Sequence, residues 1–284
     1  MYEQDSNTVR HNLALAGRRT GGARAARYAA LADAAALFAA SGSALSPTLP
    51  ALLSEGGGAS LSFLSGGDRL AFLSAYLAAR EARGEAAAAP SLLPTGPAPD
   101  KSVTYVRNPY ADEACAEFFA RYGRVPVYYA DGFDAACRAV ANGRVGYCIL
   151  PYENEGGILS GFSETAVRFS LRIVSMCRVF HTDDSRITHF ALYSRTVRPE
   201  WAAKAPCLRF SFTCPADGAL SLHLGAAEAA GGHLCRLDCL PDADAPGMLT
   251  CTATLRLPSE NLILWLHYLS VFTENPTIRG LYEE

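Results

Sequence analysis

The 284-residue sequence lacks a strong net charge and lacks any long, uninterrupted apolar run. Its formal net charge is −3, whereas binding the phosphates of a nucleic acid requires a concentrated basic surface. The longest alanine-rich stretch, residues 26–40, is interrupted by Asp33 and is too short to cross a bilayer. We therefore expect neither a nucleic-acid partner nor a membrane span. A small molecule or another protein is the expected partner.

Cysteine pairs with two intervening residues are also absent, although the chain has nine cysteines. The start of the sequence shows no basic segment followed by an unbroken apolar core and a cleavage site, so we expect a cytoplasmic protein with reduced thiols. His233, Cys235 and Cys239 lie close together in the sequence, but a fourth metal ligand at suitable spacing is missing. The sequence thus predicts no metal site and no other cofactor.

Residues 1–84 are predicted to form an N-terminal helical segment. Apolar residues recur at helical spacing over 66–84, and a second helical pattern covers 24–40. The following stretch, 85–101, contains four prolines, which interrupt helices and central strands alike. We interpret 85–101 as an Ala/Pro-rich linker that precedes the first α/β domain.

Residues 102–198 alternate between strand and helix patterns. We predict strands at 102–107, 125–130 and 145–153, and helices at 110–123 and 132–143. Short connections in this order indicate a parallel sheet covered by helices, in which ligands gather at the carboxyl ends of the strands. The segment NEGGILSG (154–161) falls at such an end. A helix near 161–170 and a hairpin of strands 171–180 and 188–195 complete the predicted domain.

The pattern starts again in residues 205–284. Strand, helix, strand, strand, helix and strand follow one another, and this βαββαβ order predicts a ferredoxin-like domain. Ser259 precedes the second of these helices and is the expected N-cap residue, because a serine hydroxyl accepts a hydrogen bond from the first turn.

Four motifs lie on these elements in a fixed order. They are ANGRVGYCILPYENEGG (141–157), Thr188-His189-Phe190, Gly218-Ala219-Leu220 and LDCLP (237–241). Together they resemble the prephenate dehydratase family followed by its regulatory ACT domain. The resemblance implies an α/β fold, in which a single periplasmic-binding-protein-like lobe (102–198) precedes a ferredoxin-like βαββαβ ACT domain (205–284).

The resemblance also implies a reaction and a set of site residues. The reaction is the conversion of prephenate to phenylpyruvate, CO2 and water in L-phenylalanine biosynthesis, with an aromatic amino acid sensed at the ACT domain of a homodimer. The implied catalytic residues are Thr188, His189 and Phe190, and the implied substrate-binding residues are Asn154, Glu153 and Arg107. The implied effector-binding residues are Gly218, Ala219, Leu220 and Asp238.

Three departures from the family pattern bear on catalysis. His189 stands where the family has an arginine, and this removes a charge-assisted contact worth roughly 1.5–3 kcal/mol. Glu155 replaces a small hydroxyl residue and would place an anionic side chain near a dianionic substrate. Only residues 181–187 occupy the position at which the family inserts its second lobe. These departures predict weak or absent catalysis.

Alternative interpretations of the same residues remain open. The chain is alternatively a noncatalytic ACT protein that binds an aromatic amino acid, or a structural subunit in which helices within 24–84 cover the exposed lobe. On a purely structural interpretation, Thr188 and His189 form a polar strand edge and 153–157 form a tight turn. A chorismate mutase at the N-terminus is disfavoured, because the charged pattern that holds a dicarboxylate is not visible there.

Overall fold

The computed structural model describes residues 23–36, 39–40, 64–85, 91–97, 99–120, 124–181, 186–197, 206–216, 219–242 and 244–283. The chain forms two compact units. The first unit comprises 1–88 together with 221–230, and the second comprises 89–220 together with 231–284. Among the described helices, none is both long enough and apolar enough to cross a membrane.

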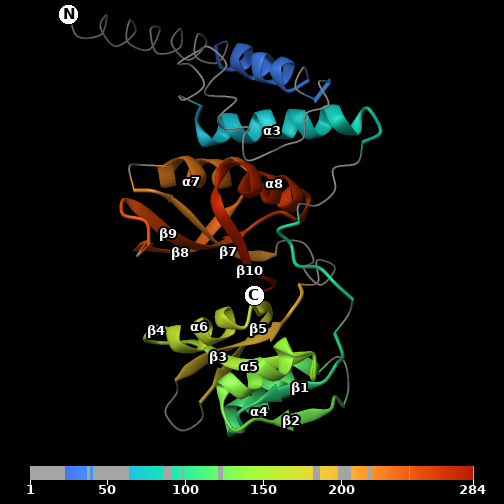
Figure 1. Cartoon of the computed structure of the whole chain (residues 1–284), viewed down its shortest axis with the longest axis vertical. Helices are drawn as coiled ribbons and strands as arrows, with labels where there is room; N and C mark the ends of the chain where they lie inside the picture. Colours follow the sequence, from blue (N-terminus) through green and yellow to red (C-terminus); the bar gives the residue numbers. More distant parts are fainter. Residues whose placement is uncertain are drawn as a thin grey trace, which may run out of the picture. The chain divides into compact units, whose positions relative to one another are not determined.

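Two helices of the first unit pack against each other. Helix α3 (Gly66–Glu81) begins with a capping box, in which the Ser65 hydroxyl accepts from the Asp68 backbone N–H at 3.2 Å. Residues 221–230, which are most of helix α7 (Ala219–Ala229) and the residue after it, belong to the same unit. The two helices approach so closely at Gly66 that a Cβ there would overlap the carbonyl oxygen of Leu222. Residues 23–36 are also helical, as predicted (Figure 1).

The first part of the second unit is an α/β lobe, as the sequence pattern predicts. Strands β1 (Val103–Tyr105), β2 (Val127–Tyr129) and β3 (Tyr147–Asn154) run parallel in the order β2-β1-β3. Helix α4 (Pro109–Phe119) starts at Asn108, whose side chain accepts from the Ala111 N–H at 2.8 Å. Helix α5 (Phe133–Ala141) ends before Gly143, whose φ of 71° requires a glycine-like conformation.

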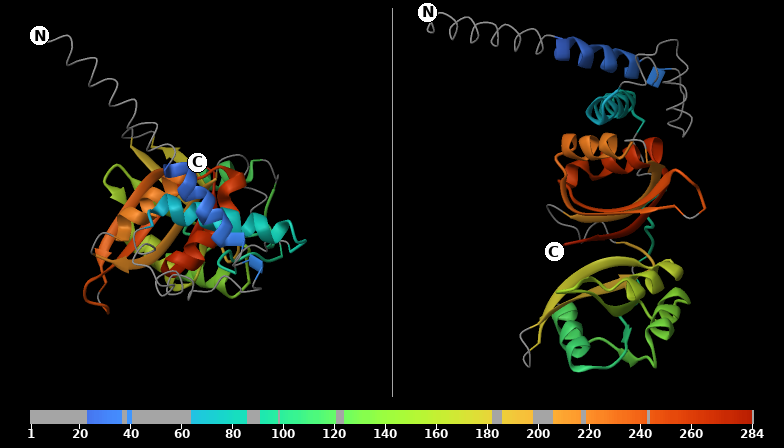
Figure 2. Two further views of the ribbon diagram at one scale, coloured as in Figure 1. Left: turned by 90° about the horizontal axis from the view of Figure 1, so that it is seen from above. Right: turned by 90° about the vertical axis from the view of Figure 1, so that its left-hand side faces the viewer.

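A hairpin extends this sheet on the other side of β3. Strands β5 (Arg172–Phe180) and β6 (Ile187–Ser194) pair antiparallel, and β6 also pairs antiparallel with β3. Both are long, curved ribbons in yellow and gold in Figure 2. Strand β4 (Gly157–Ile158), which the sequence pattern did not predict, folds back on β3, and helix α6 (Ser160–Arg168) follows it.

Helices cover both faces of the lobe's sheet. Tyr147 of β3 meets Phe119 of α4 at 5.9 Å between ring centroids. The next residue, Cys148, belongs instead to a buried cluster with Ala136 of α5 and Ala166 of α6. Successive strand residues point to opposite faces, so α4 lies on one face, and α5 and α6 lie on the other.

The C-terminal part has the predicted βαββαβ order. Its elements are β7 (Cys207–Pro215), α7, β8 (His233–Pro241), β9 (Met248–Arg256), α8 (Leu262–Phe272) and β10 (Glu274–Tyr282). The strands are antiparallel in the order β10-β7-β9-β8, which is the ferredoxin-like arrangement. The predicted Ser259 cap is wrong, because residues 259–261 form a 3-10 turn and Asn261 occupies the N-cap position of α8.

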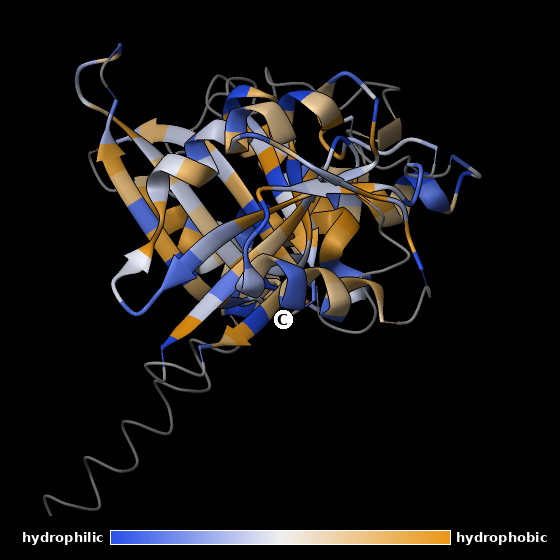
Figure 3. Cartoon of the chain, turned by 90° about the horizontal axis from the view of Figure 1, so that it is seen from below, coloured by the Kyte–Doolittle hydropathy of each residue, from blue (hydrophilic) through white to orange (hydrophobic). Residues whose placement is uncertain are grey.

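One sheet connects both parts of the second unit. Gly280 of β10 pairs with Arg209 of β7 and with Ile173 of β5, so β10 joins the lobe's strands to the C-terminal strands. Along β7, Phe210 contacts Trp265 of α8 at 5.9 Å between ring centroids, and the neighbouring Arg209 and Ser211 point to the opposite face. Figure 3 shows this alternation of hydrophobic and hydrophilic residues along the strands.

Candidate functional site

The register of β3 and β6 brings two of the sequence motifs together. Asn154 pairs with Thr188, and Glu153 pairs with His189. The register shifts between Pro151 and Glu153, which marks a β-bulge at this end of the strand. The four residues therefore meet at the carboxyl end of β3, where an open α/β sheet places its ligands.

Thr188 belongs to a hydroxyl–imidazole cluster on the α4 side of the sheet. Its Oγ1 lies 3.0 Å from Nε2 of His181, which follows the end of β5. The His181 ring stacks on Tyr110 of α4, with 3.8 Å between centroids and an angle of 14° between the planes. Tyr110 is the second residue of α4, so the cap at Asn108 also positions this ring.

The cluster has the composition needed for proton transfer. A neutral imidazole accepts the threonine hydrogen and a protonated one donates to the threonine oxygen, so the pair can pass a proton to a third atom. Such a group assists the loss of a hydroxide leaving group when the leaving oxygen comes within hydrogen-bond reach. This chemistry requires Thr188 and His181 to act together.

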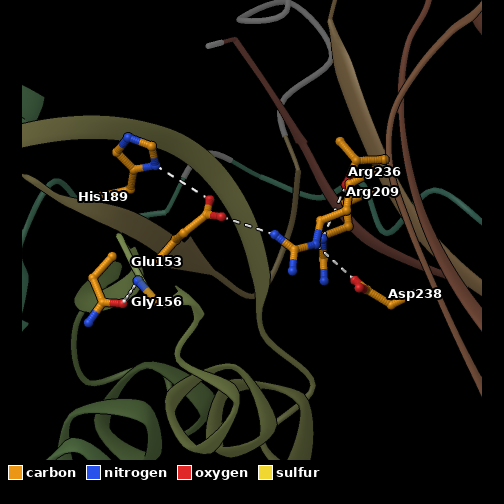
Figure 4. Close-up of polar contacts among 8 residues, drawn as sticks. Glu153, Gly156, His189, Arg209, Arg236 and Asp238 are labelled. Carbon is orange, nitrogen blue, oxygen red and sulfur yellow. Dashed lines mark hydrogen bonds and ion pairs between the residues drawn. The ribbon is translucent and has the colours of Figure 1, made fainter.

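His189 points to the opposite face, because consecutive strand residues alternate. Its Nδ1 lies 3.5 Å from Oε2 of Glu153, and the other Glu153 oxygen lies 3.0 Å from Nη1 of Arg236 on β8. Arg236 also donates from Nε to Asp238 at 3.0 Å. Figure 4 shows Glu153 between His189 and Arg236, an arrangement that we call the Glu153 bridge.

The charged groups of the Glu153 bridge are paired with one another. Burial lowers the pKa of Arg236, but the hydrogen bond and charge of Asp238, with the charge of Glu153, raise it overall. Glu153 and His189 keep 29% and 30% of their side-chain surface exposed, so the bridge lies at the wall of a cleft. Consequently, the imidazole at position 189 faces a carboxylate of the protein itself.

The cleft beside the bridge has a volume of about 1070 Å³. Residues of both parts of the second unit line it, including Tyr152 and His189 from the lobe and Arg209, Arg236 and Thr254 from the C-terminal strands. Among the described residues, no group of three or more His, Cys, Asp and Glu side chains is arranged to hold a metal ion.

Comparison with known proteins identifies the fold of the chain but no family. No protein-family model matches the chain, and no curated protein matches it. The prephenate dehydratase of Streptococcus mutans matches with a TM-score of 0.51 and 15% identity, over 64% of this chain and 97% of that chain. The chain has a prephenate dehydratase-like fold.

Two further solved structures are similar. The prephenate dehydratase of Arthrobacter aurescens, solved in complex with L-Phe, has a TM-score of 0.49 and 12% identity, over 64% of this chain and 90% of that chain. A protein described as GqqA, a novel type of quorum quenching acylase, has a TM-score of 0.49 and 23% identity, over 65% of this chain and 95% of that chain. At such identities the likeness concerns the fold alone. The α/β fold predicted from the sequence motifs is confirmed at this level.

Within the prephenate dehydratase-like fold, the predicted site residues separate into several places. Thr188 and Asn154 pair directly, and the Asn154 side-chain oxygen accepts from the Gly156 N–H at 2.9 Å. Phe190 is buried and lies opposite Pro151, so its side chain is part of the core. Arg107 lies 3.9 Å from Asp112 and stands over the Tyr129 ring at 4.8 Å.

The predicted effector residues lie on the C-terminal elements. Ala219 and Leu220 are the first residues of α7, and Asp238 on β8 accepts from Arg236. Gly218 lies outside the described residues. The assignment of these four residues to an effector site stays a prediction.

Three residues of the site were not predicted from the sequence: His181, Tyr110 and Arg236. The hairpin offered a signal for His181, because pairing of 171–180 with 188–195 brings the residue after the first strand close to the start of the second. Nothing comparable existed for Arg236, which lies 83 residues from Glu153 in the sequence and meets it only in the folded chain.

Proposed function

We propose that the chain is a degenerate relative of prephenate dehydratase that converts prephenate to phenylpyruvate, CO2 and water at a low rate. In this proposal, 102–198 is the single catalytic lobe and 205–284 is an ACT domain. An N-terminal helical segment (1–84) and a linker (85–101) precede them. The observation that carries the proposal is the Thr188 hydroxyl held 3.0 Å from the His181 imidazole beside Asn154.

The reaction needs one proton and a rigid hydroxyl donor. The bond from the ring to its carboxylate breaks, CO2 leaves, and the released electron pair completes the aromatic ring as the ring hydroxyl departs. Thr188 donates a hydrogen bond to the departing oxygen, and a protonated His181 supplies the proton that converts it to water. Asn154, which pairs with Thr188, is proposed to bind the substrate at the same strand end.

The low rate follows from the Glu153 bridge. An arginine fork is suited to a substrate carboxylate, but His189 stands at that position and faces Glu153 at 3.5 Å. The missing charge-assisted contact corresponds to about a tenfold to hundredfold loss in rate or binding. Arg107, exposed at 67% of its side chain, is the proposed replacement cation at the carboxyl end of β1.

Phenylpyruvate formation from prephenate tests the proposal directly. The purified full chain should form phenylpyruvate slowly but above the uncatalysed background, measured by absorbance. Thr188→Val should lose that activity by a hundredfold or more, because the hydroxyl donor is removed with little change in shape. Thr165→Val, which removes an exposed threonine hydroxyl on α6, is the matched control and should keep it. Turnover unchanged in Thr188→Val would contradict the assigned role.

A second candidate function is noncatalytic binding of an aromatic amino acid by an ACT homodimer. The βαββαβ order and the internally paired His189 favour it. Gly218, Ala219 and Leu220 at the start of α7, with Asp238, are its proposed binding residues. Absence of prephenate turnover together with saturable calorimetric binding of L-phenylalanine to a dimer would favour this candidate. No binding at millimolar phenylalanine, tyrosine or tryptophan would reject it.

The proposed compartment is the cytoplasm. None of the nine cysteines forms a disulfide bond in the structure, and six of them are buried. Reduced thiols of this kind are typical of cytosolic proteins.

A further inference from the structure

Three arginines lie on adjacent strands of the continuous sheet. They are Arg172 on β5, Arg279 on β10 and Arg209 on β7. Strand pairing fixes their neighbourhood, because Gly280 pairs with Arg209 on one side and with Ile173 on the other. We call these three residues the arginine row.

None of the three has a carboxylate partner among the described residues. Arg209 Nη1 donates to the Thr254 hydroxyl at 3.1 Å, and Arg279 Nε donates to the Ser211 hydroxyl at 3.0 Å. Arg172 donates from Nη1 to the Ser170 carbonyl at 2.5 Å and to the Leu171 carbonyl at 3.3 Å. Arg236, two strands from Arg209, contrasts with them because Glu153 and Asp238 both bind it.

Burial makes these uncompensated charges costly. Arg209 is only 9% exposed, although arginine is almost never buried without a partner. Desolvation lowers the pKa of Arg279, and the positive charge of Arg209 lowers it further. Desolvation also lowers the pKa of Arg172, and Arg279 adds to that effect. Arg172 Nε and the hydroxyl of its strand partner Ser194 are buried and have no hydrogen-bond partner in the described part of the chain.

Arg209 connects the arginine row to the cleft. It lines the cleft together with Thr254 and Tyr152, and its guanidinium stands 5.5 Å from the centroid of the Tyr152 ring. A guanidinium has five N–H donors, and one donor of Arg209 is used by Thr254. Its remaining donors are available to a ligand that enters the cleft.

We propose that the arginine row is a binding site for a small dianion, with Arg209 as the direct ligand and Arg279 and Arg172 contributing charge from behind. A phosphate or a small dicarboxylate has the required chemistry, because both present several oxygens to a planar guanidinium. The binding of such an anion removes the repulsion among the three cations. The site is distinct from the proposed dehydratase site, because Arg209 lies by the His189 face of the lobe's sheet and Thr188 points to the other face.

Calorimetry and thermal unfolding of the full chain test the site. Sodium phosphate and sodium succinate are titrated at constant ionic strength, with sodium chloride as the reference. We expect saturable binding of one dianion per chain and a higher unfolding midpoint, with no comparable effect of chloride. Saturation by phosphate alone identifies a compact tetrahedral anion, and saturation by succinate identifies a dicarboxylate.

Charge variants then locate the site. Arg209→Gln should weaken binding about tenfold to hundredfold, whereas Arg168→Gln on exposed α6 should leave it unchanged. Arg279→Gln should raise the unfolding midpoint without anion, because repulsion falls, and should reduce the rise that the anion causes. Glu283→Gln should tighten binding, because Glu283 adds negative charge to the cleft lining. If Arg209→Gln does not fold, Arg279→Gln and Glu283→Gln test the site instead.

Several results would overturn the proposal. Equal responses to phosphate, succinate and chloride would show that no specific anion site exists. Unchanged affinity in folded Arg209→Gln, or an equal loss in Arg168→Gln, would remove Arg209 from the binding. A lower midpoint of Arg279→Gln with an intact anion response would show that Arg279 is only structural. All these readouts are independent of phenylpyruvate formation, so either proposal can fail alone.

Discussion

His223 is a buried imidazole in the first unit, on α7. It is 6% exposed, and burial lowers its pKa from the ordinary 6.5 to about 4, with a smaller contribution from the positive charge of Arg69 on α3. A histidine with such a pKa stays neutral in the folded chain throughout the range in which an exposed histidine gains its proton. The folded chain therefore does not bind a proton at His223 in this pH range.

The lowered pKa of His223 predicts that acid destabilises the folded chain. Between pH 6.5 and pH 4 the unfolded chain binds a proton at His223 and the folded chain does not, so the free energy of unfolding falls as the pH falls. The effect is absent above pH 6.5 and reaches about 3 kcal/mol near pH 4. Urea unfolding at several pH values measures it. His223→Gln should flatten this dependence, and His233→Gln, at an exposed histidine of β8, should keep it. An equally steep dependence in His223→Gln would contradict the assignment.

Thr188 and His189 show how far single residues can be predicted from the sequence. The motif predicted both at one strand entrance, and the register places them beside Asn154 and Glu153. Their separation onto two faces follows from alternation along a strand. Their partners do not follow from any local pattern, because His181 depends on the hairpin register and Arg236 on strands far along the chain.

At the level of elements, local patterns predicted most strands and helices. Apolar runs and helical spacing depend on near neighbours, and β1, β2, β3 and α5 lie within two residues of the predicted ranges. The short strand β4 escaped prediction because two residues carry no period. The start of α8 was also missed, because the 3-10 turn at 259–261 depends on how the chain enters the helix.

The contact between α3 and α7 gives a prediction for one element. A Cβ at Gly66 would overlap the backbone at Leu222, whereas a Cβ at Gly67 would only reach the Ala229 Cβ at 3.6 Å. Gly66→Ala should therefore destabilise the first unit by about 1–3 kcal/mol, because backbone atoms cannot yield as a side chain can. Gly67→Ala should be neutral or slightly stabilising, since alanine favours a helix. The rate of proteolytic cleavage within residues 1–88 of the full chain compares the two variants. Equal protection of both variants would show that α3 and α7 do not pack in this way.

At the scale of the whole molecule, the division into units does not follow the order of the chain. Residues 221–230 lie between β7 and β8 in the sequence, yet they group with residues 1–88. The sequence pattern predicted boundaries near residues 84 and 101 but gave no reason to join a C-terminal helix to the N-terminal segment. Such a contact depends on surfaces that meet only after both elements have formed.

This shared helix predicts the consequence of removing the N-terminal segment. His223, Ala226 and Ala227 are buried in the full chain, and a fragment of residues 89–284 keeps α7 without its partners from the first unit. The fragment should bind a hydrophobic dye, unfold at a lower temperature and aggregate, because apolar helix surface becomes exposed. A fragment of 64–284, which restores α3 and its buried Leu70, Phe72 and Tyr76, should recover most of the stability. If 89–284 is as soluble and as stable as the full chain, residues 1–88 do not stabilise the C-terminal module, and the structural-subunit interpretation loses its main support.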